Sequence, residues 1–419
     1  MRGKYFYGYN IVAASFVIQG VCIGALFAYG IFFKELQNEY GWSRATISGA
    51  SSLAFLLMGS VGILAGRLND RIGPKILIAV SGISFGSGYL LMSRLQAPWQ
   101  LYLFYGGLVG IGLCTHDVVT LSTIARWFVK RRGMMTGIVK VGTGAGQLLV
   151  PLIASGLIAA WGWRNACSIL GALVLVTMVV FAQLMRRDPQ EMGLLPDGVF
   201  AHADGDGAES REEGIRLRDA LRMIPFWIMS VTWFALFFCL FTVIVHIVPH
   251  ARDLGLAPAT AAGVLSMIGG VSMVGRFVMG AAVDRIGGKQ SLIICFIILV
   301  CGLIFLQFAT KAWMLYAVAG IYGFAHGGLF TVVSPTMAEM FGTGSHGVLY
   351  GLVLFSGSVG GSVGPLLAGR IFDVTGSYRL VFIILVGLAV AGLILVTLLR
   401  SPRPSGQPDE NIPAAAESG

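Results

Sequence analysis

Apolar stretches of about 20 residues recur along the whole chain, separated by short polar segments. This is the length that an α-helix needs to cross the roughly 30 Å hydrocarbon core of a bilayer, whereas a membrane β-strand needs about ten residues of alternating polarity. The pattern therefore predicts an all-α membrane protein with twelve transmembrane helices. We expect these spans at residues 9–33, 46–66, 75–93, 98–125, 133–158, 165–185, 226–250, 259–282, 289–309, 313–338, 347–369 and 378–399.

The widest polar interval lies between the sixth and seventh spans, from Asp188 to about Pro225, and is rich in glycine and acidic residues. Such a composition is typical of a linker. We expect an N-terminal six-helix half at 1–187, a cytoplasmic linker at 188–225, a C-terminal six-helix half at 226–400 and a cytoplasmic tail at 401–419. The last part of the linker, Ile215 to Met223, is a candidate for a short surface helix.

Composition excludes several classes of protein. Hydrophobic residues make up 56% of the 419 residues and charged residues 12%, against roughly 25% charged in soluble domains. A mean hydropathy of +0.80 leaves too little polar surface for a soluble globule. All six cysteines fall inside apolar runs, so they indicate packing rather than disulfides or zinc ligands. We expect no cofactor and no metal, and the net charge of +9 does not require a nucleic acid partner.

Basic residues predict the orientation. If both termini are cytoplasmic, the cytoplasmic segments hold 19 of the 29 Lys and Arg residues and the opposite side holds 8, while Lys140 and Arg276 lie inside spans. This excess follows the positive-inside rule. We therefore expect a multi-pass protein of the cell inner (plasma) membrane with both termini in the cytoplasm.

The two halves share a repeat at an offset of 214 residues. The loop after span 2 contains Asp70 and Arg71, and the loop after span 8 contains Asp284 and Arg285 at the matching positions. The other matched pairs are Gly66 with Gly280, Ile72 with Ile286, Gly73 with Gly287, Lys75 with Lys289, Gly133 with Gly347, Gly137 with Gly351, Gly146 with Gly360 and Pro151 with Pro365. A repeat of six spans keeps its direction through the membrane, so the halves are parallel repeats about an axis along the membrane normal.

Twelve spans in two halves and a doubled G-x-x-x-D-R-x-G-x-K loop resemble the major facilitator superfamily over nearly the whole chain. The resemblance implies the major facilitator fold, with two six-helix halves around a central cavity. The loop places Asp70, Arg71, Asp284 and Arg285 at cytoplasmic helix ends. There these residues can pair with neighbouring helix termini and hold one gating state closed; the alternative is that the arginines only anchor the helix ends at the membrane surface.

Sequence motifs typical of enzymes occur in this chain, but not in the secondary structure that catalysis requires of them. Gly82–Gly86 and Gly360–Gly364 both fit G-x-S-x-G, but each lies in an apolar span rather than at a strand–turn–helix junction. No His-Glu-x-x-His occurs, and only one Asp lies deep in a span. We therefore do not expect an enzyme. No ATP-binding motif is present either, so transport would draw on ion or solute gradients.

Three formal charges lie inside the spans, namely Asp117, Lys140 and Arg276. Each costs about 2.5–3.5 kcal/mol at the membrane centre, so each should face a cavity or a partner. From the helical rise of 1.5 Å per residue, all three lie about 10–14 Å from the cytoplasmic helix ends. They can therefore share one layer at the interface between the halves, where transporters with such repeats bind substrate. The alternative is a structural Lys140–Asp117 pair, with Arg276 bonded to backbone carbonyls.

The repeat indicates whether the fold itself requires Lys140 and Arg276. Lys140 corresponds to Leu354 in the other half, and Arg276 corresponds to Gly62, so the fold requires neither charge at the related position. The layer carries a net charge of +1, which a singly charged anion would complete. Arginine fits a carboxylate with two parallel hydrogen bonds, and lysine supplies a movable point charge.

The segment from Trp127 to Gly133, leading into a glycine-rich span 5, and the arginine of span 8 resemble the monocarboxylate porter family. The resemblance implies a bacterial homologue of the proton-coupled lactate and pyruvate transporters, with Arg276 binding the carboxylate. Two positions depart from the family. Its animal members have an aspartate four residues before that arginine, where this chain has Ser272, and a lysine late in span 1, where Phe27 falls.

Because the family's usual proton-handling pair is missing, we propose that Asp117 and Lys140 replace it. Weaker substrate-binding candidates are Phe27, Tyr29, Ser272, Tyr322, His326 and Phe330, which lie at depths compatible with contact to a small substrate. Aromatic residues in apolar helices more often serve packing, and a lone histidine is more often hydrogen-bonded than titrating. His116 adjoins Asp117 but would point about 100° away on an ideal helix.

Three functions follow from these residues. The first is a symporter that moves a small monocarboxylate, such as lactate or pyruvate, together with a proton. The second is an exchanger of the oxalate/formate type, whose members use an arginine in span 8 and a lysine in span 11, where this chain has Leu354. The third, a receptor, would need a signalling module. Asp117 favours the symporter, because it cancels one positive charge and offers a proton site. The expected partners are the anion, the proton and the lipid bilayer, with a monomer as the working unit.

Overall fold

The computed structural model describes residues 6–42, 44–198 and 215–399, and every structural statement below concerns these residues. The predicted tail at 401–419 lies outside them, as does most of the glycine-rich part of the predicted linker. The described chain is helical. Its elements are α1 (Gly8–Tyr40), α2 (Arg44–Ile72), α3 (Pro74–Met92), α4 (Pro98–Leu101), the π-helical η1 (Tyr102–Val109), α5 (Gly110–Leu113), α6 (Val118–Trp127), α7 (Arg132–Ala182), the 3₁₀ turns η2 (Pro189–Met192) and η3 (Pro196–Gly198), α8 (Leu217–Ala220), α9 (Ile224–Asp253), α10 (Pro258–Ile286), α11 (Gly288–Leu306), α12 (Ala312–Phe341), α13 (His346–Thr375) and α14 (Arg379–Leu398).

Eleven of the described helical runs are long and apolar enough to cross a membrane. One of them, α7, has 51 residues and would be about 76 Å long if it were straight, more than twice the thickness of the hydrocarbon core. Within it, Gly162 has φ 75° and ψ 161°, which are not helical dihedral angles. Glycine adopts this conformation readily because it has no Cβ. The chain turns there, so α7 contains two spans. The twelve predicted spans are therefore present.

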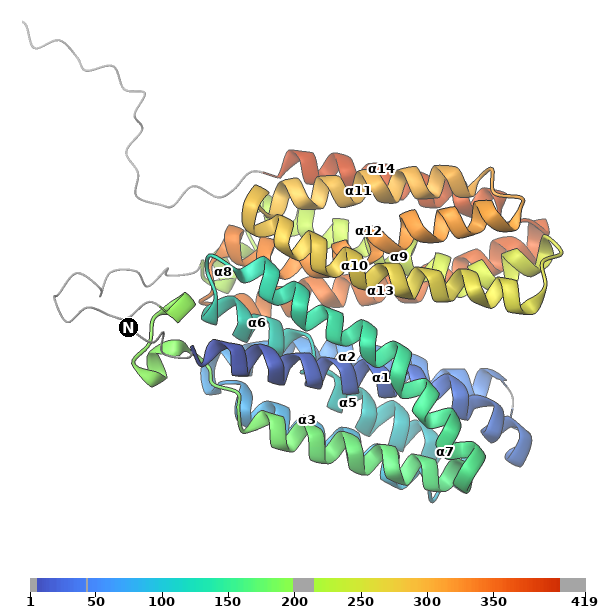
Figure 1. The fold of residues 1–419 in the computed structure, drawn as a ribbon, viewed down its shortest axis with the longest axis horizontal. Coiled ribbons are helices and arrows are strands. Elements are labelled where there is room, and N and C mark those ends of the chain that lie inside the picture. The colour runs from blue at the N-terminus through green and yellow to red at the C-terminus, as the bar shows by residue number, and fades with distance from the viewer. Residues whose placement is uncertain (1–5, 43, 199–214, 400–419) are drawn as a thin grey trace, which may run out of the picture.

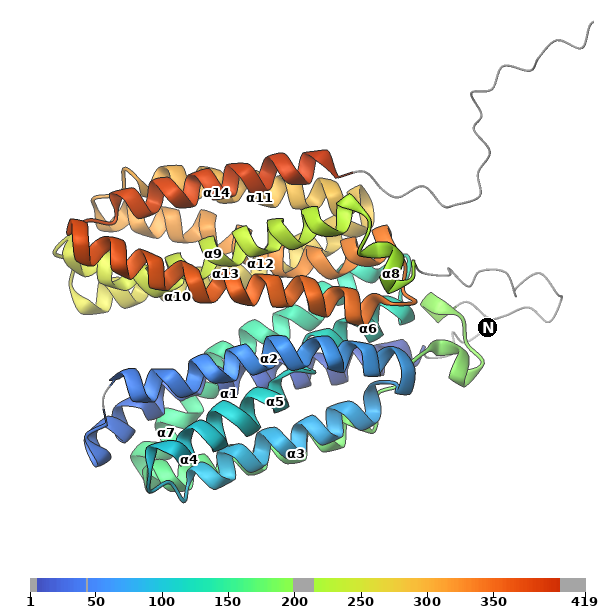
Figure 2. The same ribbon diagram turned by 180° about the vertical axis from the view of Figure 1, so that it is seen from behind.

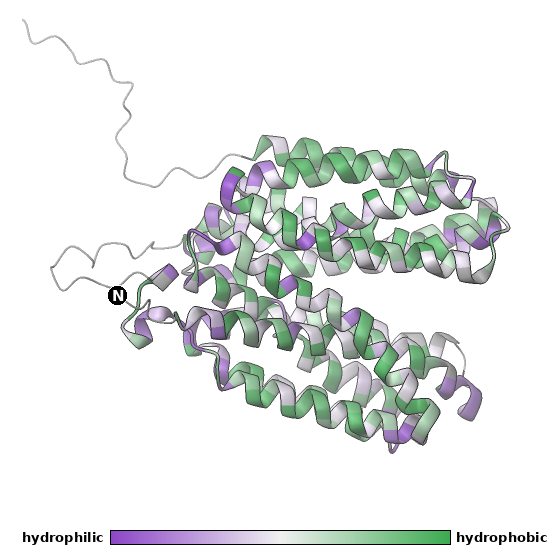
Figure 3. Cartoon of the chain, viewed as in Figure 1, coloured by the Kyte–Doolittle hydropathy of each residue, from purple (hydrophilic) through white to green (hydrophobic). Residues whose placement is uncertain are grey.

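The helices form two bundles, α1–α7 and α9–α14, which lie side by side in Figures 1 and 2. The bundles approach each other through α7 against α10 and α2 against α13. Hydrophilic residues gather towards the two ends of the bundles, and hydrophobic residues cover the helix lengths between them (Figure 3). Large apolar side chains on the outside remain exposed, among them Leu366 (76%) and Val374 (72%). Such a surface is matched to lipid rather than to water.

The bundles touch most closely at the end where α2 and α10 finish and α7 and α13 begin, which we call the closed end. A Cβ on Gly66 would lie 2.2 Å from the carbonyl oxygen of Gly347, and one on Gly133 would lie 2.3 Å from that of Gly280. Neither distance is possible for a real Cβ, so glycine is required for this backbone approach. The repeated glycines of the sequence thus form the contact between the halves.

The linker contributes a short helix at its end. α8 covers four residues within the nine that were expected to be helical, and the N–H of Ile215 donates to the carbonyl of Phe341 at 2.9 Å. This end of the linker is therefore held against the second bundle.

Candidate functional site

A cavity of about 120 Å³ lies between the two bundles. This is roughly ten times the minimum of about 10–15 Å³ that one water requires, so a solute of a few non-hydrogen atoms fits. The lining residues come from both halves: Ile23, Leu26, Phe27, Phe55, Met58, Gly59, Gly62, Cys114, His116, Asp117, Val118, Lys140, Thr143, Gln147, Phe237, Phe241, Ile244, Arg276, His326, Phe330, Gly351, Leu354 and Ser358. The wall is mostly apolar, with the charges gathered in one region.

The helix that carries Asp117 is interrupted at that residue. α5 ends at Leu113, the next four residues form a turn, and α6 starts at Val118, with the π-helical η1 before them. The predicted fourth span is present as the helical run Pro98–Trp127, with this irregular stretch inside it. The side chains of His116 and Asp117 both line the cavity. Irregular backbone at membrane depth is tolerated where it borders a cavity.

Asp117 and Lys140 form a buried ion pair, with Lys140 Nζ 2.5 Å from Asp117 Oδ1. The carboxylate also accepts a hydrogen bond from Gln19 Nε2 at 2.8 Å and one from the Tyr350 hydroxyl at 3.3 Å. Thr143 donates to Gln19 Oε1 at 2.8 Å and so fixes the orientation of that amide. Neither Gln19 nor Tyr350 was among the predicted site residues, because neither carries a charge that would mark it inside an apolar span. A glutamine in the middle of the first apolar run was the available signal for Gln19.

Arg276 is 2% exposed, yet it has no carboxylate partner among the described residues. One guanidinium nitrogen donates to the backbone carbonyl of Lys140 at 3.2 Å, and Nε is buried without a partner. Asp117, Lys140 and Arg276 thus line the same cavity between the halves, as expected from their positions in the spans. The symmetry-related positions, Leu354 and Gly62, line the same cavity. A buried guanidinium without a carboxylate partner lowers the stability of the empty protein. An anionic ligand could supply the missing negative charge and accept its hydrogen bonds.

Aromatic rings of the second half border the charged region. The Phe330 ring packs against Phe237, with 5.0 Å between centroids, and lies 5.8 Å from Lys140 Nζ. The His326 ring lies 5.0 Å from that of Phe330, and its Nδ1 is buried without a hydrogen bond. An apolar wall beside two cations favours an anion that carries an uncharged body.

Three of the six weaker candidates line the cavity, namely Phe27, His326 and Phe330. The other three, Tyr29, Ser272 and Tyr322, do not. Tyr29 donates to the carbonyl of Ile47 at 2.8 Å and stacks on Tyr105 inside the first bundle. Ser272 donates to the carbonyl of Gly269 at 2.7 Å, and Tyr322 to that of Leu240 at 2.7 Å. Their depths were compatible with the site, but their helices turn these side chains into packed interfaces, so we do not assign them to substrate.

At the closed end, each loop aspartate binds the start of a helix in the opposite half. Asp284 accepts the N–H groups of Gly133 at 2.6 Å and Met134 at 2.8 Å, at the beginning of α7. Asp70 accepts those of Gly347 and Val348, both at 3.2 Å, at the beginning of α13. These N–H groups have no partner within their own helices, and the helix dipole favours an anion there.

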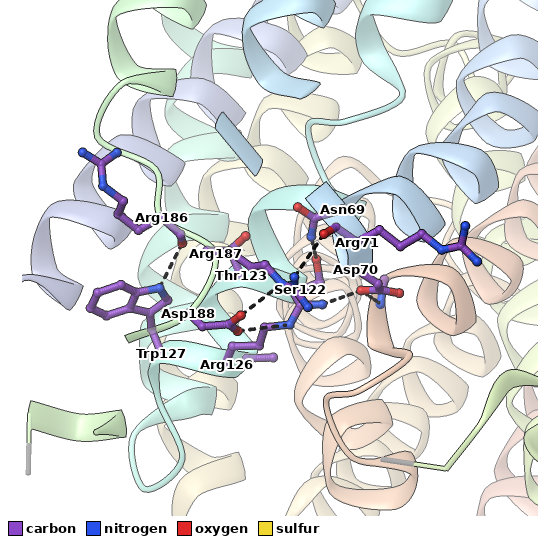
Figure 4. Close-up of polar contacts among 12 residues, drawn as sticks. Asn69, Asp70, Arg71, Ser122, Thr123, Arg126, Trp127, Arg186, Arg187 and Asp188 are labelled. Atoms are coloured by element: carbon purple, nitrogen blue, oxygen red, sulfur yellow. Dashed lines mark hydrogen bonds and ion pairs between the residues drawn. The ribbon is translucent and has the colours of Figure 1, made fainter. Parts of the chain in front are cut away.

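Arg126 on α6 completes the contacts of Asp70 (Figure 4). Its guanidinium pairs with the Asp70 carboxylate and lies 3.8 Å from Asp188, at the start of the predicted linker. The side chain of Arg71 extends away from this cluster in Figure 4. Arg71 and Arg285 are both exposed, and neither side chain makes an ion pair within the described chain. The aspartates, rather than the arginines beside them, form the contacts between the halves.

The polar contacts beside Arg126 stay within the first half. Asn69 donates to the Ser122 hydroxyl at 2.8 Å, and Arg187 donates to the carbonyl of Arg71 at 3.1 Å (Figure 4). These bonds connect α2 with α6 and with the last residue of the predicted N-terminal half. The closed end of the first half is therefore one hydrogen-bonded unit.

Comparisons with known proteins agree with this geometry. A sequence profile described as Major Facilitator Superfamily matches residues 12–301 and 250–417. Monocarboxylate transporter 13 of Bos taurus is 29% identical over 395 residues, covering 94% of this chain and 89% of that protein. Monocarboxylate transporter 4 of Rattus norvegicus is 26% identical, with 94% and 83% covered.

Solved structures share the fold at low sequence identity. The proton:xylose symporter XylE superposes with a TM-score of 0.71 at 14% identity, covering 93% of this chain and 95% of that one. The E. coli fucose:proton symporter FucP gives 0.70 at 13% identity, with 92% and 97% covered. Because the profile spans nearly the whole sequence and the relatives named here are transporters rather than enzymes, the chain belongs to the major facilitator superfamily as a multi-pass membrane transporter related to the monocarboxylate transporters.

Proposed function

We propose that this protein is a secondary active transporter that moves a small monocarboxylate, of the lactate or pyruvate kind, together with a proton. The observation that carries the proposal is Arg276, a buried guanidinium in the cavity without an acid partner among the described residues. A carboxylate would supply the missing charge and accept hydrogen bonds from it. The names of the relatives support the same substrate class.

Charge balance supports proton coupling. Asp117, Lys140 and Arg276 together carry +1 when all are ionised. A proton on Asp117 raises the layer to +2 and releases Lys140 from its partner, and the anion then binds between Lys140 and Arg276 and returns the layer to +1. The loaded and empty carriers thus have the same buried charge, so both can reorient at a tolerable cost.

The contacts of Asp70 and Asp284 support a gating role for these residues. We propose that the closed end faces the cytoplasm, in keeping with the excess of basic residues on that side of the sequence. In this orientation the protein, with both termini in the cytoplasm of a plasma membrane, takes up anion and proton from the opposite side. Each chain has its own cavity between its two halves, so we propose that the monomer is the working unit. We further propose that 1–187 and 226–400 are the two moving halves and that 188–225 links them.

Exchange of anions without a proton is the alternative. Two cations could hold a dianion, but the Lys140–Asp117 pair at 2.5 Å leaves only Arg276 unneutralised, which favours a single negative charge. Asp117→Asn separates the two mechanisms. The variant should still exchange internal for external anion but should fail to accumulate it against a gradient when driven by pH. Uphill uptake by Asp117→Asn would contradict the proposed proton site.

The deciding experiment is uptake of labelled L-lactate into proteoliposomes, with and without an inward proton gradient, by the native protein and by Arg276→Ala. We expect the proton gradient to stimulate lactate uptake by the native protein, and we expect Arg276→Ala to show no such uptake. Uptake that requires preloaded internal anion would favour the exchanger. Absence of lactate uptake under both conditions would refute lactate as the substrate.

A further inference from the structure

The hydroxyl of Tyr350 joins the proposed proton site to the opposite half of the protein. Tyr350 lies near the start of α13 and is fully buried, and its hydroxyl donates to Asp117 Oδ2 at 3.3 Å. Asp117 immediately precedes α6 in the first half. The residue that would take up the proton is thus part of a contact between the two halves.

The same two helices are joined a second time at the closed end. The first turn of α13 donates two N–H groups to Asp70, and Asp70 pairs with Arg126, near the far end of α6. α6 has ten residues and is therefore about 15 Å long. A short rigid helix is thus connected to the beginning of α13 at both of its ends, once in the cavity and once at the closed end.

The fold itself does not require the contact in the cavity. At the repeat offset of 214, Tyr350 corresponds to Thr136 and Asp117 to Thr331, and neither threonine can reproduce a phenol–carboxylate bond. The Tyr350 ring packs separately, stacked on His346 with 5.7 Å between centroids. Packing explains the ring but not the direction of the hydroxyl.

We propose that Tyr350 is a positioning residue that makes opening of the closed end depend on protonation of Asp117, an inference that rests on the proposed proton symport. While Asp117 is ionised, the hydroxyl bond is charge-assisted and holds the halves together. A proton from the open side neutralises the carboxylate, which weakens that bond and releases Lys140. Tyr350 keeps its own proton throughout. The closed end then opens more often when the proton is bound, and a carrier that holds the anion without the proton stays closed.

Several charged or titratable groups face Asp117 besides Tyr350. They are Lys140 on α7, Arg276 on α10 and His116 in the same turn, with Gln19 on α1 as a neutral donor. Around the Tyr350 ring lies His346, whose Nε2 contacts the carbonyl of Ser334 at 3.1 Å. Removing the hydroxyl alone leaves all of these groups in place, so the Tyr350→Phe variant isolates the proposed link.

The first readout is transport by Tyr350→Phe in proteoliposomes. Because a hydrogen bond to the ionised carboxylate is lost, the pH midpoint of proton-driven uptake should rise by about one unit, and unprotonated carriers should open about ten times more often. Accumulation of the substrate should therefore fall, while anion exchange at equal pH stays within about twofold of native. Tyr89→Phe is the matched control, since it removes another fully buried hydroxyl that bonds a backbone carbonyl at 2.5 Å.

The second readout is the distance across the closed end, measured between spin labels on Ile72→Cys and Gly344→Cys in a Cys301→Ser background, because Cys301 is the exposed native cysteine. Native protein should open as the pH falls, and Tyr350→Phe should open at higher pH. In an Asp117→Asn background, adding Tyr350→Phe should leave the distance distribution unchanged. If the phenylalanine acted instead by disturbing packing, it would widen the distances further even in that background. The distance needs no substrate, so it separates this inference from the proposed transport of lactate. Identical opening in native protein and Tyr350→Phe, or equal loss of exchange and accumulation, would overturn the inference.

Discussion

Replacing Arg276 by methionine removes a buried charge while keeping an unbranched side chain that can pack against the apolar cavity wall. The hydrogen bond to the Lys140 carbonyl is lost, which costs about 1 kcal/mol. Against this, the protein no longer holds an unpaired ion away from water, a penalty of several kcal/mol. We therefore expect the empty carrier to be as stable as the native protein or about 1–3 kcal/mol more stable.

Lys140→Met is the matched comparison, because it removes a cation of the same cavity that does have a partner. Asp117 would then remain buried with only Gln19 and Tyr350 as donors. Breaking a buried ion pair in this way costs about 3–5 kcal/mol. The two substitutions, which look alike in sequence, should therefore change stability in opposite directions.

Substrate binding should respond differently from stability. Truncating one member of a buried, hydrogen-bonded charge pair costs about 2–5 kcal/mol, or roughly 30-fold to several-thousand-fold in affinity. The assay is the thermal unfolding midpoint of purified protein in detergent, with and without lactate, since a bound ligand raises this midpoint. We expect lactate to raise the midpoint of the native protein and not that of Arg276→Met.

Two results would refute the reasoning. One is a fall in the midpoint of empty Arg276→Met as large as that of Lys140→Met, which would mean that the guanidinium is a structural group. The other is an undiminished effect of lactate on Arg276→Met, which would place the carboxylate elsewhere.

Three further predictions concern the closed end and the proton site. Asp284→Asn should weaken the contact with the start of α7 by about 1–2 kcal/mol, so the population of carriers with an open closed end should rise roughly 5- to 30-fold. Spin-label distances across the closed end measure this population, and an unchanged distance distribution would contradict the gating role of Asp284. Gly66→Ala should prevent closure of the closed end and slow transport, because the added Cβ would meet the carbonyl of Gly347. Gly30→Ala is the control, since its Cβ would lie in open space, and this variant should transport normally. Equal transport rates for the two variants would contradict the required approach at Gly66. Gln19→Leu removes a 2.8 Å donor to Asp117, so proton-driven uptake should reach its midpoint at a higher pH, and a profile like that of native protein would show that this bond does not influence protonation.

The sequence determined the helical class, the twelve spans and the doubled architecture. A bilayer requires helices of a fixed minimum length, and the 214-residue repeat is enough to place Asp70 and Asp284 at equivalent helix ends. The sequence also determined that Asp117, Lys140 and Arg276 share a depth, because depth along a helix follows from a constant rise per residue.

Rotation about each helix axis was decided only by the tertiary structure. Tyr29 and Tyr322 have suitable depths but donate to backbone carbonyls within their own bundles, whereas Gln19 and Tyr350 turn towards Asp117. Which face of a nearly uniform apolar helix looks inward depends on the shapes of its neighbours, and little in the local sequence encodes it. The break before α6 has the same origin, since its irregular backbone is stabilised by the cavity and the packing around it. The sequence placed the charges at one level of the membrane, and the packing of the helices decided that Lys140 pairs with Asp117 while Arg276 has no acid partner among the described residues.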